Sequence, residues 1–99
     1  MVAVRDKIAR IPPLVDYDRL SDVVYVSLGR PMPDEGEDRP YGIILRYALK
    51  DNRPVGVTVV GFRRNGWDRK LRELSDIIGR HLTIDPSGVL DALEGGTRR

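Results

Sequence analysis

The sequence predicts a single α+β domain, in which a small antiparallel β-meander of about four strands is packed on one face by a C-terminal amphipathic helix. Residues 14–62 contain short apolar runs rich in β-branched side chains, separated by segments of turn composition. Residues 65–82 carry apolar side chains at steps of three and four, which is typical of a helix with one buried face. We therefore expect a meander at 14–62, a helical part at 65–94 and a tail at 95–99.

Composition excludes several classes of protein. Hydrophobic residues make up 40% of the chain and charged residues 32%, which is typical of a folded domain. The absence of cysteine excludes disulfides and thiol chemistry. No run of 18 apolar residues is present, so no membrane span is expected, and the charged segment 1–13 does not resemble a secretory signal. The cytoplasm is the expected location.

The first predicted elements are short. Apolar residues with helical spacing precede the Pro12-Pro13 pair, so a short helix is predicted at residues 2–10. Strands are predicted at 14–18 and 23–28, because the residues between them have turn composition. Residues 29–40 contain three prolines and two glycines and have no apolar period, which predicts a loop.

The strongest structural signal is a hairpin at residues 41–62. A three-residue loop at 51–53 places Leu45 opposite Val59 and gives one consistently apolar face. A slip of one residue would turn that face to solvent, so this register is the expected one. Asn52 is the loop residue that best tolerates the left-handed conformation such loops need.

Two helices are predicted after the hairpin. Asn65 is the expected N-cap of the first helix, at residues 65–82. Asp85 is the expected N-cap of a shorter helix at 86–94, with proline at its first position. Gly95-Gly96 is expected to end that second helix.

The sheet face opposite the Leu45/Val59 core is also apolar. Its predicted members, which form the candidate interface, are Val23, Tyr25, Ile44, Val60 and Phe62. One helix covers only one face of a sheet, so a second apolar face predicts a partner. Two-fold association is the commonest kind, so we expect a homodimer. In the alternative, the N-terminal segment with Val4, Ile8 and Ile11 folds over this face and keeps the chain monomeric.

Candidate catalytic and metal-binding groups are few. Asp16 and Asp18 share one face of a predicted strand, and such a pair can serve acid–base chemistry or bind a metal. They lie beside a turn, where aspartate is common for backbone reasons, and calcium-loop spacing is absent. His81, the single histidine, has no nucleophile or orienting acid at a suitable offset. We interpret the acidic segment 34–38 as a solvated loop, and assign no catalytic residue, metal or cofactor.

Positive charge is concentrated in one segment. The net charge is +2, from 17 basic and 15 acidic residues, which is low for a dedicated nucleic-acid-binding protein. The candidate basic patch in residues 63–72 consists of Arg63, Arg64, Arg69, Lys70 and Arg72. The polar face of an amphipathic helix has the same composition, so nucleic-acid binding is only a weaker alternative.

The strand segments also carry a resemblance to a known family. The motifs are Tyr17-Asp18, Asp22-Val23-Val24-Tyr25-Val26-Ser27-Leu28, Gly42-Ile43-Ile44-Leu45 and Pro54-Val55-Gly56-Val57-Thr58-Val59. Over residues 16–62, about half the chain, they resemble the small bacterial family called domain of unknown function 2283. The chain departs from the family pattern in its acidic, proline-rich segment 29–40 and in its longer helical tail. It also has Arg46 where the family usually has an acidic residue, and Asn52-Arg53 where the family has a turn glycine.

The resemblance implies no reaction and no catalytic residue. Some relatives are thought to lie beside toxin-like genes, which indicates an antitoxin-like or other partner-binding role. Together with the apolar face, this predicts a non-enzymatic, self-associating interaction domain. The alternative from another class is a small enzyme or ligand-binding protein with its site at the subunit interface, lined by Tyr25, Tyr47 and the Asp16/Asp18 pair.

Overall fold

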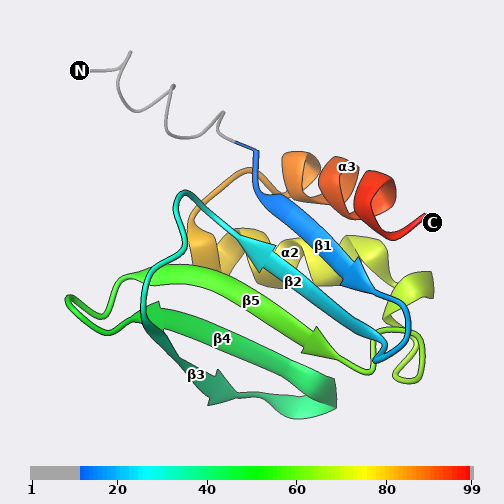
Figure 1. Cartoon of the computed structure of the whole chain (residues 1–99). Helices are drawn as coiled ribbons and strands as arrows, with labels where there is room; N and C mark the ends of the chain where they lie inside the picture. Colours follow the sequence, from blue (N-terminus) through cyan, green and yellow to red (C-terminus); the bar gives the residue numbers. More distant parts are fainter. Residues whose placement is uncertain (1–11, 99) are drawn as a thin grey trace.

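The computed structural model describes residues 12–98, which form a five-stranded antiparallel sheet with two helices against one face (Figure 1). The strands are β1 (Leu14–Asp18), β2 (Val23–Ser27), β3 (Asp34–Asp38), β4 (Ile43–Ala48) and β5 (Pro54–Val60). The helices are α2 (Leu71–Leu82) and α3 (Pro86–Thr97), and the short 3-10 turns are η1 (Pro40–Gly42) and η2 (Trp67–Arg69). The predicted α+β class is confirmed. The helix predicted at 2–10 lies outside the described residues.

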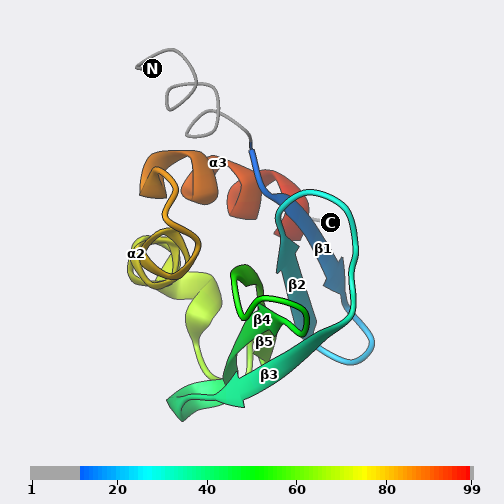
Figure 2. The same cartoon turned by 90° about the vertical axis from the view of Figure 1, so that its left-hand side faces the viewer.

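The strand order is β1-β2-β5-β4-β3, and every neighbouring pair is antiparallel. β5 is therefore central, and β1 and β3 are the two edges. After β2 the chain crosses one end of the sheet to reach β3 at the opposite edge (Figure 2). This crossing brings the connection between β2 and β3 close to the β4–β5 turn.

β3 corrects the predicted loop at 29–40 and raises the number of strands from about four to five. Its sequence is acidic and lacks apolar alternation, because the side chains of this edge strand are largely exposed. Backbone bonds just beyond its ends join the N–H of Leu49 to the carbonyl of Pro33 at 3.0 Å and the N–H of Arg39 to the carbonyl of Ile43 at 2.7 Å. The strand is thus specified by pairing with β4 and not by its own apolar pattern.

The predicted hairpin register is wrong by two residues, although the predicted faces are right. Leu45 lies opposite Val57, and Val59 lies opposite Ile43. An irregularity between Arg46 and Tyr47 and a longer β4–β5 turn absorb the difference. A shift of two residues preserves the alternation of side chains, so the apolar face still points to the core. Asn52 has a φ of 61°, as expected for a residue in the left-handed region.

The core lies between the sheet and the two helices. On the sheet side it contains the inward-facing residues of the three central strands, Val24, Val26, Ile43, Val57 and Val59. On the helix side it contains Leu74, Ile78, Leu82, Val89 and Leu93. α2 and α3 both pack here, and within residues 12–98 no helix lies over the opposite face of the sheet (Figures 1 and 2).

The start of α2 differs from the prediction. The helix begins at Leu71 with Lys70 as its N-cap, so Asn65 is not the cap. Residues 61–66 instead form a turn, in which the Asn65 side-chain amide donates to the carbonyls of Tyr41 and Val60 at 3.1 Å. Asn65 thereby joins the end of β5 to the η1 turn.

The end of α3 also differs from the prediction. Asp85 caps the helix as expected, because its carboxylate accepts the N–H of Ser87 at 2.9 Å. The helix then continues through Gly95-Gly96 to Thr97, so the predicted tail is shorter. Gly96 lies against β1, where an added Cβ would be 2.6 Å from Cγ1 of Val15. This glycine therefore serves close helix–strand packing rather than helix termination.

Asp22, in the β1–β2 turn, joins two parts of the chain that are far apart in sequence. Its carboxylate accepts the N–H groups of Arg63 at 2.9 Å and Arg64 at 3.1 Å, and the hydroxyl of Tyr17 at 2.9 Å. Partial burial raises the pKa of the Asp22 carboxyl, but these donors outweigh burial and hold the pKa below its usual value of 3.8. Burial, followed by the bond to Asp22, raises the pKa of the Tyr17 hydroxyl.

Candidate interaction surface

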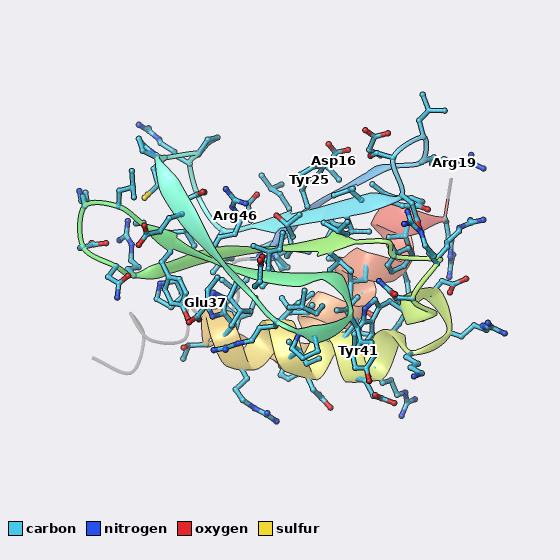
Figure 3. All side chains as sticks on the ribbon, turned by 90° about the horizontal axis from the view of Figure 1, so that it is seen from below. Asp16, Arg19, Tyr25, Glu37, Tyr41 and Arg46 are labelled. Atoms are coloured by element: carbon cyan, nitrogen blue, oxygen red, sulfur yellow. The ribbon has the colours of Figure 1, made fainter. Side chains whose placement is uncertain are left out.

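The candidate surface is the face of the sheet that points away from α2 and α3, here called the outer face. Strand pairing places Asp16 beside Tyr25, and Tyr25 beside Thr58, which in turn lies beside Ile44. Val23 lies beside Val60 in the next row of the same face. Figure 3 shows the side chains of Asp16 and Tyr25 projecting from the side opposite the helices. The outer face therefore brings together residues of four strands.

Two apolar side chains of the outer face are exposed, and two more are partly exposed. Tyr25 is 46% exposed and Val60 is 40% exposed. Val23 and Ile44 are half-buried by their neighbours on the same face. These four residues form a continuous apolar patch, and among the described residues no helix covers it.

Two polar residues complete the outer face. Thr58 is only 5% exposed, because neighbouring side chains close over it. Arg46 extends across the sheet, where its guanidinium pairs with the carboxylate of Asp34 and lies 3.5 Å from the Thr58 hydroxyl. Figure 3 shows Arg46 on the same side as Tyr25. The Arg46 stem therefore extends the apolar surface while its charge is paired within the protein.

Phe62 is the member of the predicted interface that the structure places elsewhere. It is 2% exposed and contacts Tyr17 in the core, with ring centroids 5.3 Å apart. β5 ends at Val60, and Gly61 then adopts a φ of 72°. The alternation of side chains stops at this glycine, so Phe62 turns toward the helices instead of following Val60 outward.

The two predicted strand carboxylates serve different roles. Asp18 accepts the N–H of Leu20 at 3.1 Å and so closes the β1–β2 turn, which agrees with the backbone interpretation. Hydrogen bonds from the side chain and backbone of Ser21 lower the pKa of the Asp18 carboxyl. Asp16 is exposed at the rim of the apolar patch. Among residues 12–98, no group of three or more His, Asp or Glu side chains is arranged to hold a metal ion.

His81 has a packing contact with the sheet. Its ring meets the ring of Tyr47 edge-on, with centroids 5.0 Å apart. Its Nε2 lies 3.2 Å from the carbonyl oxygen of Arg46, which only accepts, so this nitrogen carries the proton. The histidine thus ties the end of α2 to β4.

The acidic and basic segments are both partly neutralised by neighbours. In β3, Glu37 pairs with Arg39 at 3.1 Å and accepts the Tyr47 hydroxyl at 3.3 Å. The five residues of the basic patch are exposed, but they are divided between the 61–66 turn, η2 and the start of α2. Glu73 and Glu94 line the same surface cleft as the patch residues of η2 and α2. The basic patch is therefore mixed with acidic side chains in space.

Comparisons of the chain with protein-family models, curated proteins and solved structures find no match. The resemblance noted for residues 16–62 therefore stays a prediction. Along residues 12–98, no helix is both long enough and apolar enough to cross a membrane.

Proposed function

We propose that the protein is a non-enzymatic interaction domain that self-associates through the outer face of its sheet. The observation that carries this proposal is the exposed apolar patch of Val23, Tyr25, Ile44 and Val60, on a face that neither α2 nor α3 covers. A second copy of the chain offers the same patch, and an isologous two-fold contact covers both at once.

The strength of this association follows from the remaining exposure of the patch. Full burial of a large apolar side chain contributes roughly 1.5–3 kcal/mol, and these four are already about half covered. Each then contributes about 1 kcal/mol, or about 8 kcal/mol for two copies, before the cost of association. The cost of association, about 4 kcal/mol or more, reduces this figure, so a dimer at tens of micromolar requires that the other residues of the outer face also contribute.

The role of such a dimer is to present a surface to another protein. The resemblance to a family with members beside toxin-like genes supports a protein partner of this kind. Of the exposed acids of β3, Asp38 lies beside Ile44 at the rim of the patch, whereas Glu35 lies beside Tyr47 on the helix-facing side and would remain accessible in a face-to-face dimer.

Sedimentation of the wild type and of Tyr25→Lys tests the proposal. The lysine faces Asp16 across the β1–β2 pair, so the monomer keeps a favourable contact while the patch gains a charge. We expect a dimeric wild type at tens of micromolar and a folded, monomeric variant. Leu49→Lys is the matched control, because Leu49 is 58% exposed in the β4–β5 turn, away from the patch.

A wild type that stays monomeric at this concentration contradicts self-association. In that case a chain lacking residues 1–11 distinguishes the two remaining explanations. Dimerisation of the shortened chain alone means that the N-terminal segment occupies the outer face. A monomer in both forms leaves the face to a different protein.

A further inference from the structure

A cleft at one end of the sheet is formed by segments that are far apart in the sequence. Its lining comes from the β2–β3 connection, the β4–β5 turn with the start of β5, and the end of α2 with the residues after it. These segments lie toward the left of Figure 1. Its volume is about 440 Å³, within the range of small-molecule sites. Its apolar wall consists of Leu28, Met32, Pro54, Val55, Leu82 and Ile84.

The inner part of the cleft is continuous with the hydrophobic core. Leu82 is 7% exposed, and Val55 and Ile84 are each 9% exposed, so these side chains are buried except for a small part of their surface. Leu82 and Ile84 belong to the same packed cluster as the central strands. A hydrocarbon group placed here would meet only apolar side chains, and its removal from water would be favourable.

Two arginines from different elements complete the cleft. Arg30 follows β2, and Arg53 precedes β5. Among residues 12–98, Arg30 makes no ion pair. The Arg53 guanidinium lies 3.6 Å from the sulfur of Met32, at the wall, and its Nε is 3.9 Å from Asp51, the outer limit of an ion pair.

The charge of the cleft is therefore one-sided. Of the residues that the structure describes, two arginines and no acidic residue line it, and Asp51 lies outside the lining. Both arginines are exposed, with Arg53 at 54%, so they lie at the mouth rather than on the apolar floor. Guanidinium groups bind carboxylates through paired N–H donors, which suits an anionic head group at this position.

We propose that this cleft binds a small amphipathic carboxylate. Its hydrocarbon body lies on Val55, Leu82 and Ile84, and its carboxylate lies at the mouth with Arg30 and Arg53. The inference does not rest on the proposed self-association. Val55 and Leu28 lie on the helix-facing side of the sheet, whereas the self-association uses the outer face on the opposite side.

Titration of the isotope-labelled full chain with sodium octanoate, followed by methyl NMR, tests the site. We expect saturable shifts confined to the methyl groups of the cleft wall, Leu28, Met32, Val55, Leu82 and Ile84. Octylammonium, which has the same hydrocarbon body and the opposite charge, should give no comparable shifts. Met32→Trp should fill the cleft and abolish binding. Arg30→Gln and Arg53→Gln should each weaken octanoate binding about tenfold or more, as expected for loss of a charged hydrogen bond.

Arg39→Gln is the matched control, since it removes an exposed arginine whose partner is Glu37 in β3. It should leave octanoate affinity unchanged. Equal binding of octylammonium, undiminished binding by Met32→Trp, or no saturable shift by about 1 mM octanoate overturns the assignment. Equal weakening by Arg39→Gln would show that only overall charge attracts the anion, and this also overturns it.

Discussion

Replacement of Asp22 by glycine is expected to destabilise the fold by about 2–3 kcal/mol. The N–H groups of Arg63 and Arg64 and the hydroxyl of Tyr17 lose a charged acceptor. Each such bond contributes about 1 kcal/mol here, because Arg63 and Arg64 are exposed and water replaces part of the loss. Glycine adopts the Asp22 φ of 61° without the strain that this φ costs aspartate. The strain removed roughly offsets the loss of stability that comes from the greater entropy of glycine in the unfolded chain.

Urea denaturation followed by the fluorescence of Trp67 measures this loss. Trp67 is the single tryptophan, is 7% exposed, and directly follows the turn that Asp22 holds. In a domain of this size the loss corresponds to a fall in Tm of roughly 8–24 °C. The slope of the transition should not change, because the fold is the same.

Asn52→Gly is the control for the glycine itself. Asn52 also has a φ of 61° and is exposed in the β4–β5 turn, and within the described part of the chain its side chain makes no hydrogen bond, so the substitution should be close to neutral. An Asp22→Gly variant within about 0.5 kcal/mol of the wild type refutes the reasoning. An equal loss in Asn52→Gly refutes it as well, because the cost would then come from the unfolded state.

Three further outcomes are expected. The folded-state pKa of Asp22 is lowered, so its carboxylate stabilises the fold above the usual pKa of 3.8 and this stabilisation is lost as the pH falls below it. The stability difference between wild type and Asp22→Asn should therefore shrink in urea titrations at acid pH, and a constant difference contradicts this. Gly96→Ala should lower the Tm, because the new Cβ would lie 2.6 Å from Cγ1 of Val15. Gly95→Ala is the control, since its Cβ would meet open space and the alanine should raise the Tm through its higher helix propensity. Equal changes of Tm in the two variants would contradict close packing of α3 on β1. Duplex DNA should not be retained by the basic patch at moderate salt, and a steep fall of log affinity with log salt would contradict this.

Several elements of the structure follow from local sequence patterns alone. The alternation in β2 and β5 and the apolar period of α2 predict the sheet, the helix and the face each buries. Asp85 and Asn52 were predicted from single-residue preferences for a cap and for a left-handed turn, and both predictions are confirmed. Four of the five residues expected on the outer face, all but Phe62, also follow from the sequence, because alternation along a strand assigns its outward residues once the inward ones are known.

The tertiary structure decided what depends on contacts between distant segments. β3 has no apolar pattern and exists because β4 offers it an edge, while Phe62 faces the core because one glycine ends the alternation of β5. The network of Asp22 and the cleft with Arg30 and Arg53 each combine segments that no short window of sequence contains. Periodicity reports which side of an element is buried, but pairing partners, turn lengths and converging loops are set by the energy of the whole packed chain.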